Sequence, residues 1–345
     1  MSSPTPSGRP QVRIVGTGLI GTSLGMALSR KGFRVALEDP SPTAAALARD
    51  LGAGILAAGS EDIPDLVVVA APPDVVAAVV AHELTRWPDA VVTDAASVKG
   101  TVLAALQDKG ADLTRYVGSH PMAGRERSGA VAAQADLFEG RSWVVAPGPQ
   151  ASAVAVDMVC QIAEAAGSAV LVMTPDEHDA AVAAVSHVPQ IAASLVASRL
   201  RDLPAGAIAL SGQGIRDVTR IAASDPGMWT QILSGNAPAV RAVLESFAED
   251  LDAVLVALRH LESEPDGSAV GARAVLANAV ANGHAGQSRI PRKDGPAPKQ
   301  YETVLVGGTD TPGQIVRMLV QGRGCGGKQA ERRQRAGGAH PLRTV

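Results

Sequence analysis

Two short stretches of the chain combine predicted strand ends with side chains that can move a proton or hold an anion. In GSHPMAGRERSG, His120 stands directly before a proline that would end its strand, and in TDAASVKG, Ser97 and Lys99 follow another strand. Because parallel strands end on one edge of a sheet, we expect these three side chains to lie close together. An imidazole beside a hydroxyl can act as a general base, although a lone histidine before a proline is more often structural.

Two later stretches add a second histidine and two arginines. Ser186 and His187 lie in VSHVPQ, and Arg216 and Arg220 lie in GIRDVTRIAASDPGMW. A guanidinium holds a carboxylate through paired hydrogen bonds. With His120, these residues suit the oxidation of an alcohol that carries carboxylates, because the imidazole takes the hydroxyl proton as hydride leaves. Such a reaction needs a hydride acceptor.

A glycine-rich turn near the N-terminus predicts where that acceptor binds. Residues 12–28 read VRIVGTGLIGTSLGMAL, which is a β-branched strand, a GxGxxG turn and an apolar helix in that order. Gly16 would make the tight turn, Gly18 would let the backbone approach a pyrophosphate, and Gly21 would let helix and strand pack closely. The phosphates would lie on the free N–H groups of the helix. A strand, turn and helix without a ligand is the alternative interpretation.

The end of the second predicted strand, residues 34–37, indicates which dinucleotide is bound. Glu38 and Asp39 follow it, and the Pro-Ser-Pro sequence after them contains no arginine. A carboxylate here grips the ribose hydroxyls and repels the 2′-phosphate of NADP, so the expected cofactor is NAD. Asp39 is the first candidate for this role, and Glu38 is the alternative. The expected cofactor contacts are Gly16, Thr17, Gly18, Leu19, Ile20, Gly21, Asp39, Ala71 and Pro72.

The elements that must position these residues divide the chain into two parts. Short apolar strands alternate with Ala-rich helical stretches at first, which predicts βαβ units and a parallel sheet. Further strands are expected at residues 66–70, 91–94, 116–119, 142–146 and 169–173. From Thr174, a predicted helix N-cap followed by a proline, only helices are expected. The sequence therefore predicts an α/β Rossmann-type nucleotide-binding domain (residues 11–174) and an all-α dimerisation domain (175–285), with a disordered N-terminus (1–10), a linker (286–300) and a C-terminal segment (301–345).

Composition excludes several classes of function. Residues 286–345 carry 11 Lys and Arg against 4 Asp and Glu, whereas residues 1–285 carry 20 against 30, and so acidic a body argues against a nucleic-acid partner. The only cysteines, Cys160 and Cys325, lie far apart, which predicts neither a disulfide framework nor a thiolate metal site. The first ten residues do not resemble a signal peptide and no apolar run reaches the length of a membrane span, so we expect a cytoplasmic protein without a membrane partner.

The predicted helix over residues 237–262 carries an apolar stripe. Its members are Val240, Leu244, Phe247, Leu251 and Leu255. A helical domain this apolar, with few aromatic residues, is expected to bury surface against a second copy of itself. We therefore predict a homodimer formed through the helical domain.

Five stretches in order carry a family resemblance. GTGLIGTSL, TDAASVKG, GSHPMAGRERSG, VSHVPQ and GIRDVTRIAASDPGMW resemble the prephenate/arogenate dehydrogenase family of tyrosine biosynthesis, and the resemblance covers residues 11–285. It implies a nucleotide-binding domain followed by a helical dimerisation domain. It also implies an NAD-dependent oxidative decarboxylation of prephenate to 4-hydroxyphenylpyruvate, or of arogenate to tyrosine, in which hydride leaves ring C4 and the ring becomes aromatic as carbon dioxide is lost. This chemistry requires no metal.

The resemblance implies roles for single residues as well. His120 resembles the catalytic residue that accepts the proton of the C4 hydroxyl, and Ser97 resembles the serine bonded to that hydroxyl. Lys99 would support the loop at the site, and Arg220 would bind a substrate carboxylate. The other substrate contacts implied are Ser186, His187, Gln190 and Glu126, the last at the mouth of the site. Some members carry a second histidine three residues after His187, where this chain has Gln190.

The C-terminal segment departs from the family pattern. Some relatives carry a small ligand-binding ACT domain, and VLVGGTDTPGQIVRMLV resembles its opening strand and helix. The Gly- and Arg-rich residues after Gln321 do not resemble the remainder, which predicts a partial ACT-like segment with a disordered basic tail; an ordinary disordered tail is the alternative. Two other functions stay open: a β-hydroxyacid dehydrogenase, which lacks the HPMAG stretch, and a non-catalytic NAD-binding sensor, in which His120 and Arg220 would have no purpose.

Overall fold

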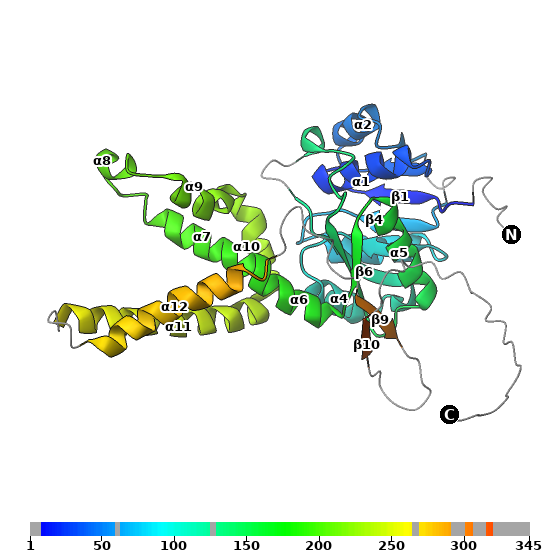
Figure 1. Cartoon of the computed structure of the whole chain (residues 1–345). Helices are drawn as coiled ribbons and strands as arrows, with labels where there is room; N and C mark the ends of the chain where they lie inside the picture. The colour runs from blue at the N-terminus through cyan, green and yellow to red at the C-terminus, as the bar shows by residue number, and fades with distance from the viewer. Residues whose placement is uncertain are drawn as a thin grey trace, which may run out of the picture.

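The chain folds into an α/β domain from which a helical arm extends (Figure 1). The computed structural model describes residues 8–58, 63–124, 129–263, 269–290, 301–305 and 315–319. The sheet of the α/β domain ends with residue 172, and every element from there to residue 287 is helical. The predicted fold class, a Rossmann-type domain followed by an all-helical domain, is therefore confirmed.

The α/β domain is built on an eight-stranded sheet with the order β3-β2-β1-β4-β5-β6-β7-β8. Its strands are β1 (Val12–Val15), β2 (Val35–Glu38), β3 (Ile55–Leu56), β4 (Leu66–Val69), β5 (Val91–Asp94), β6 (Tyr116–Pro121), β7 (Ser142–Pro147) and β8 (Ala169–Val172). The strand order reverses between β1 and β4, which opens a crevice at their carboxyl ends. This crevice lies beside the glycine turn.

The sheet is parallel except where β7 runs antiparallel to β6. The sequence predicted a parallel sheet, and this one pair differs from that prediction. A parallel connection needs a crossover of a dozen or more residues, usually a helix. Between β6 and β7 the described residues form only a short 3₁₀ turn, η3 (Ala130–Ala132), so the chain returns along β6 in the opposite direction.

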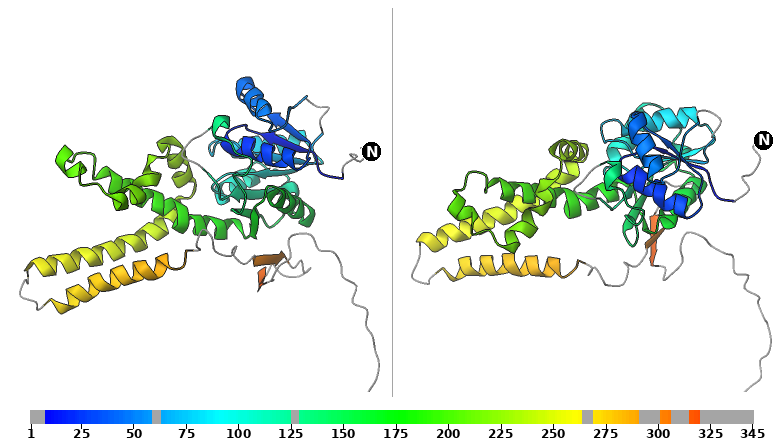
Figure 2. Two further views of the ribbon diagram at one scale, coloured as in Figure 1. Left: turned by 45° about the horizontal axis from the view of Figure 1, so that its top comes forward. Right: turned by 90° about the horizontal axis from the view of Figure 1, so that it is seen from above.

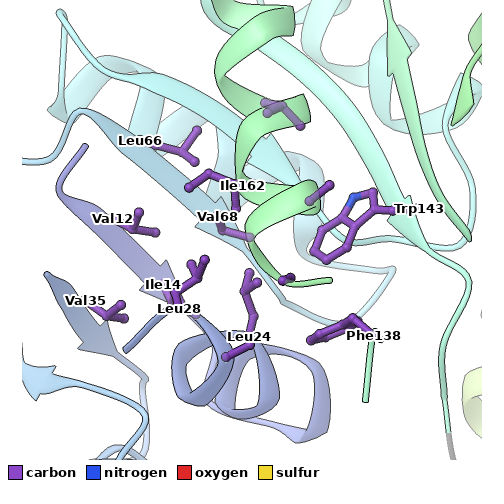
Figure 3. Packing of buried hydrophobic residues seen from close by; sticks show 14 of the residues in the cluster. Val12, Ile14, Leu24, Leu28, Val35, Leu66, Val68, Phe138, Trp143 and Ile162 are labelled. Atoms are coloured by element: carbon purple, nitrogen blue, oxygen red, sulfur yellow. The ribbon is translucent and has the colours of Figure 1, made fainter. Parts of the chain in front are cut away.

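Helices cover both faces of this sheet. They are α1 (Leu19–Arg30), α2 (Pro42–Asp50), α3 (Val76–Arg86), α4 (Gly100–Asp108) and α5 (Ala153–Ala165). Figure 3 shows Leu24 and Leu28 of α1 packed near Ile14 of β1, with Ile162 of α5 and Trp143 of β7 in the same core. Each buried aliphatic side chain contributes about 1.5–3 kcal/mol. This packing fixes where α1 begins, and therefore where the glycine turn lies.

The helical arm starts at a capping box. Thr174 Oγ1 accepts a hydrogen bond from the backbone N–H of Glu177 (3.2 Å), whose carboxylate accepts from the backbone N–H of Thr174 (3.0 Å). The predicted N-cap is thus confirmed. The elements that follow are α6 (Pro175–Val182), a π-helical turn η4 (Ala183–His187), α7 (Val188–Ser198), α8 (Ala205–Ile208), α9 (Gln213–Thr219), a 3₁₀ turn η5 (Arg220–Ala223), α10 (Pro226–Gly235), α11 (Ala237–Ser263) and α12 (Val270–Gln287).

The arm is long and exposes much apolar surface. In Figures 1 and 2, α11 and α12 lie side by side and project away from the α/β domain. Of the predicted apolar stripe on α11, Val240 is buried, whereas Phe247, Leu251 and Leu255 are exposed. This surface is not covered within one chain.

One helical run in the arm is long and apolar enough to cross a membrane, so the expectation that no apolar run reaches this length is wrong. Pro175–Ser198 passes this test by length and composition alone, as the core helices of many proteins do. Its buried residues include His178, Asp179 and His187. His178 and Asp179 have partners in the α/β domain and His187 has partners in the arm, as buried polar side chains of a core helix do, so the run is weak evidence for a membrane span.

The C-terminal segment differs from its prediction. β9 (Tyr301–Leu305) and β10 (Ile315–Leu319) form an antiparallel pair, so the helix expected over the second stretch is wrong. β-branched residues such as Ile315 and Val316 favour strands once a partner strand is present. Helix α12 also runs two residues into the expected linker. Residues 1–7, 291–300 and 320–345, which hold most of the predicted disorder, lie outside the described residues.

Candidate functional site

The glycine turn between β1 and α1 leaves open space at one of its three glycines. Gly16 has a φ of +99°, and a Cβ there would lie 2.4 Å from the carbonyl oxygen of Ala70. A Cβ on Gly21 would lie 1.9 Å from the carbonyl oxygen of Gly16, whereas a Cβ on Gly18 would meet nothing within 4 Å. The fold therefore requires the first and third glycines. The second faces space that a ligand can enter, beside the start of α1, which no side chain caps.

The two carboxylates at the end of β2 have different partners. Glu38 pairs with Arg13 and Arg86; burial alone would raise its pKa, but the two guanidinium groups outweigh burial and lower it. Asp39 Oδ2 accepts hydrogen bonds from the backbone N–H (2.7 Å) and hydroxyl (2.9 Å) of Thr17 in the glycine turn. Asp39 Oδ1 accepts from the backbone N–H of Ser41 (2.8 Å). Glu38 contacts the turn through its backbone carbonyl, which accepts from the N–H of Gly16 (2.8 Å), whereas Asp39 contacts it through its carboxylate.

A cleft of about 470 Å³ opens beside Asp39. Its lining residues are Val15, Glu38, Asp39, Pro40, Val75, Ala78, Val79, His82 and Glu83. An apolar cleft next to a carboxylate at the end of the second strand suits the adenosine half of a dinucleotide. Glu38 and Glu83 are paired with arginines, so the carboxylate of Asp39 is the one that would repel an additional phosphate on the ribose. The donor set at this end of the site therefore fits NAD.

The histidine of β6 belongs to a chain of hydrogen bonds that enters the helical arm. Nδ1 of His120 lies 2.9 Å from Nε2 of His178 on α6, and Nδ1 of His178 lies 2.8 Å from Oδ1 of Asp179. Asp179 stays ionised because the hydrogen bonds from His178 and from the backbone N–H groups of Lys99 and Gly100 outweigh burial and lower its pKa. The chain therefore ends in a fixed negative charge.

This chain fixes which nitrogen of His120 can act as a base. The carboxylate of Asp179 can only accept, so Nδ1–H of His178 donates to it. With one proton on the His178 ring, its Nε2 has a lone pair and accepts from Nδ1–H of His120. The Nε2 of His120 then carries a lone pair. Burial lowers the pKa of His120 well below its usual value, and any positive charge on the neighbouring His178, Lys99 and His187 side chains lowers it further. His120 is thus neutral at pH 7 and able to accept a proton.

Asp179 also joins the two domains. Its Oδ1 accepts a hydrogen bond from the backbone N–H of Lys99 (2.9 Å) and its Oδ2 accepts one from that of Gly100 (2.8 Å). A carboxylate of the helical arm therefore caps the N-terminus of α4 in the α/β domain. The backbone carbonyl of Asp179 accepts from Nδ2 of Asn236 (2.8 Å), which follows α10. One residue of α6 therefore holds α4, His178 and the start of α11 in a fixed relation.

The ammonium of Lys99 is held inside the fold. Nζ of Lys99 forms an ion pair with Asp94 and donates to the carbonyl oxygen of Ser119 (2.7 Å), and Tyr116 donates to the other oxygen of Asp94 (2.7 Å). Burial lowers the pKa of Lys99, and the Asp94 charge opposes that effect. These contacts fasten the loop after β5 to β6, which corresponds to the loop-supporting role that the resemblance implied rather than to direct substrate contact.

The π-helical turn carries the second histidine. His187 is buried, its ring meets that of Trp229 edge to face with 6.1 Å between ring centroids, and its Nδ1 lies 3.1 Å from Nδ2 of Asn236. Gln190 on α7 is also buried, and its Oε1 has no hydrogen-bond partner in the described part of the chain. π-Helical turns inside α-helices are frequent at functional sites. This one places His187 near His120, whose pKa responds to its charge.

The structure brings some of the predicted site residues together and separates others. Lys99 and His187 are buried and His120 is half-buried in one cluster, and Ser97 and Ser186 are half-buried on the loop after β5 and on the π-helical turn. Arg220 does not belong to this cluster: it is exposed at the start of η5, which packs against α7 and α9. Arg216 is exposed and donates to the carbonyl oxygen of Ser211 (3.1 Å). Glu126 lies outside the described residues.

The sequence analysis missed three polar residues of the cluster: His178, Asp179 and Asn236. His178 and Asp179 stand in PDEHD directly after the predicted N-cap, where acidic residues are expected for helix electrostatics alone. A histidine and an acid adjacent at a domain junction could have indicated a site. Asn236 lies between two helices and offers no such signal, because its contacts are made with residues 49 and 57 positions away.

Comparisons with known proteins agree with this geometry. The family model described as prephenate dehydrogenase, nucleotide-binding domain, matches residues 24–186, and the one described as prephenate dehydrogenase, dimerization domain, matches residues 174–266. The chain is 36% identical over 315 residues to a probable prephenate dehydrogenase, NovF, of Streptomyces niveus, covering 91% of this chain and 86% of that protein. It is 32% identical over 264 residues to a cyclohexadienyl dehydrogenase of Zymomonas mobilis, covering 72% and 88%.

A solved structure is similar as well. The prephenate dehydrogenase from A. aeolicus, in complex with hydroxyphenyl propionate and NAD+, has a TM-score of 0.69 and 28% sequence identity. The likeness covers 83% of this chain and 98% of that one. The likeness thus spans both the α/β domain and the helical arm.

Proposed function

The chain belongs to the prephenate dehydrogenase family, and we propose that it converts prephenate to 4-hydroxyphenylpyruvate with NAD. The observation that carries this proposal is the hydrogen-bonded chain from His120 through His178 to Asp179. In support of it, the chain leaves a lone pair on Nε2 of His120 at the carboxyl end of β6, on the same edge of the sheet as the glycine turn after β1. Oxidation of a ring alcohol needs a base of this kind at that place.

For the cofactor, we propose contacts from the glycine turn and the two strand ends beside it. Gly18 gives the pyrophosphate room against the start of α1, and Asp39 holds the adenosine ribose. Ala71 and Pro72, directly after β4, border the crevice on its other side. When bound, NAD accepts the hydride from C4 of the substrate.

For the proton, we propose that Nε2 of His120 takes it from the C4 hydroxyl while Ser97 holds that hydroxyl. The imidazolium that forms keeps its Nδ1–H directed at His178, whose other nitrogen faces the Asp179 carboxylate. The negative charge at the end of this chain stabilises the positive charge that develops on His120. Aromatisation with loss of carbon dioxide supplies the driving force, so the protein has only to orient the ring and accept one proton.

We propose that the substrate's carboxylates and side chain are contacted by Arg220, Ser186, His187, Gln190 and Glu126. Lys99 supports the loop after β5 through its contacts with Asp94 and Ser119. The buried Oε1 of Gln190 supports its inclusion, because an amide oxygen without a donor is costly inside a protein and a ligand can satisfy it. Arg220 is exposed, which leaves its guanidinium accessible to a dianionic substrate.

We also propose a homodimer in the cytoplasm. The exposed apolar side chains of α11, such as Phe247 and Leu251, lie on the helical arm that the dimerisation-domain family model matches. Burying this surface against a second copy would stabilise both copies. A monomeric mass in sedimentation at micromolar concentration would contradict the dimer.

The experiment that tests the function offers prephenate and arogenate separately, each with NAD and with NADP, and follows absorbance of the reduced cofactor. Turnover of prephenate with NAD is the expected result. Turnover of arogenate alone would keep the mechanism and change the substrate. If NAD binds but neither compound is oxidised, the proposal is wrong.

A further inference from the structure

Asn236 bridges two groups at the junction of the domains. It lies between α10 and α11 and is 4% exposed. Its Nδ2 lies 2.8 Å from the backbone carbonyl oxygen of Asp179 and 3.1 Å from Nδ1 of His187. A buried side-chain amide with two such partners is fixed in place, and it fixes its partners in turn.

The chemistry of the three groups allows only one arrangement of protons. A carbonyl oxygen cannot donate, so the atom of Asn236 that faces Asp179 must be the NH₂ group rather than the amide oxygen. The same NH₂ group faces Nδ1 of His187, and it can only donate. Nδ1 of His187 must therefore accept, which places the single proton of the neutral ring on Nε2.

From this geometry we propose that Asn236 is a positioning residue that holds His187 as a hydrogen-bond donor, with Nε2–H directed at an oxygen of the substrate. That a substrate oxygen accepts from Nε2–H rests on the proposed function, whereas the tautomer of His187 is a property of the protein without substrate. Nε2 of His187 has no partner among the residues that the structure describes, so it is the ring nitrogen left for a ligand.

Two further observations agree with a neutral, fixed ring. Burial lowers the pKa of His187 to about 4, so the ring carries one proton at pH 7 and its tautomer decides what it can bind. The edge-to-face contact with Trp229 restricts rotation of the ring. A donor held in this way suits a carboxylate or carbonyl oxygen and rejects an ammonium group.

The tautomer can be measured without substrate. In the full-length protein labelled with ¹⁵N-histidine, the resonances of His187 are assigned by comparison with His187→Gln. We expect Nδ1 to show the shift of an unprotonated nitrogen and Nε2 that of a protonated one. A protonated Nδ1 in the ligand-free protein would overturn the proposal, whatever the activity.

A variant tests the consequence for binding. Asn236→Asp replaces the donor with a carboxylate, which accepts from Nδ1–H and moves the lone pair of His187 to Nε2. We expect KM for prephenate to rise about ten- to a hundredfold, the loss of one hydrogen bond to a charged group, while kcat changes less and the NAD dissociation constant stays the same. An unchanged KM would overturn the proposal.

Thr101→Val is the matched control. Thr101 on α4 donates to the carbonyl oxygen of Gly235, one residue before Asn236, so the variant loosens the same junction without touching His187. We expect its KM to stay within twofold of wild type. A loss equal to that of Asn236→Asp would show that junction stability, not the tautomer, is responsible. If no compound is oxidised but the tautomer is as expected, only the proposed function fails.

Discussion

The cofactor end and the substrate end of the site are built by different means. At the cofactor end, backbone from one continuous segment, β1 to β2, makes the turn, and two glycines are required because carbonyl oxygens lie where a Cβ would stand. At the substrate end, side chains from β6, α6, η4 and the residue after α10 meet in a buried cluster. At the cofactor end the turn leaves no room for a side chain at Gly16 or Gly21, whereas the substrate end depends on hydrogen bonds between side chains.

This difference determines how each end responds to substitution. At the turn, one added methyl group acts by itself, and its effect depends on the space around it. In the cluster, Asp179 holds His178, the start of α4 and Asn236 together, so the effects of substitutions there are coupled and do not add.

Replacing His120 should have the largest effect on the reaction. His120→Asn removes the base, and we expect kcat to fall by about two to four orders of magnitude. NAD binding should be unchanged, because the glycine turn is untouched. Steady-state kinetics and cofactor titration check both statements, and near-normal turnover would remove His120 from its proposed role.

Replacing Asp179 should impair His120 indirectly, through His178. Asp179→Asn removes the charge that orders His178 and caps α4, and we expect kcat to fall about ten- to a hundredfold, since a hydrogen bond to a buried charged group contributes about 1.5–3 kcal/mol. The melting temperature should fall as well. In the His120→Asn background the same change should cost little further activity, because the two residues act as a unit. Additive losses in kcat would contradict the coupling.

The glycine turn allows a paired comparison at the cofactor end. Gly21→Ala places a methyl group 1.9 Å from a carbonyl oxygen, so we expect a loss of about 1–3 kcal/mol in the free energy of unfolding. Gly18→Ala has open space, so its stability should match wild type while its NAD affinity falls. Chemical denaturation and cofactor titration separate the two. Equal NAD affinity in Gly18→Ala and wild type would mean that the pyrophosphate does not lie there.

The features that the sequence predicts correctly are local, as the glycine turn is, and the ones that it misses depend on contacts between distant residues, as the substrate end does. The strand, glycine turn and helix over residues 12–28 are contiguous, and β1 and α1 form where the pattern predicted them. The N-cap at Thr174 is equally local and equally well predicted. Apart from its bond to the adjacent His178, the contacts of Asp179 span 57 to 80 positions, and no local pattern encodes which distant backbone N–H groups a carboxylate will cap. The wrong helix at β10 has a related cause, because pairing with β9 overrides a helical periodicity.

Replacing Arg220 tests whether the exposed part of the helical arm takes part in substrate binding. If its guanidinium binds a substrate carboxylate, Arg220→Ala should raise KM for prephenate about tenfold with little change in kcat, as loss of a uniform binding contact does. Arg216→Ala is the matched control, since Arg216 is also an exposed arginine, on the preceding helix α9. If KM responds to Arg216→Ala and not to Arg220→Ala, the anion contact belongs to Arg216.

The smallest expected effect is a displaced pH profile. The base must be unprotonated, and burial, followed by the charges of His178, Lys99 and His187, lowers the pKa of His120. The acid limb of kcat/KM should therefore lie below pH 6.5, the usual histidine value, with a plateau above it. His178→Gln keeps an acceptor for Nδ1–H but removes the coulombic contribution of His178, one of the causes that lower the pKa of His120, so the limb should move back toward pH 6.5.

Stability should follow the same sign. His120 and His187 bind protons more weakly in the folded chain than in the unfolded chain, so acid favours unfolding. Their stabilising effect is complete above about pH 6.5 and is lost as the pH falls toward the folded-state value, which for His187 is about 4. The glycine turn contains no titratable group, so Gly21→Ala should lower the melting temperature equally at pH 7 and pH 5. A pH-dependent difference there, or an acid limb at or above pH 6.5 in wild type, would contradict the contrast between the two ends.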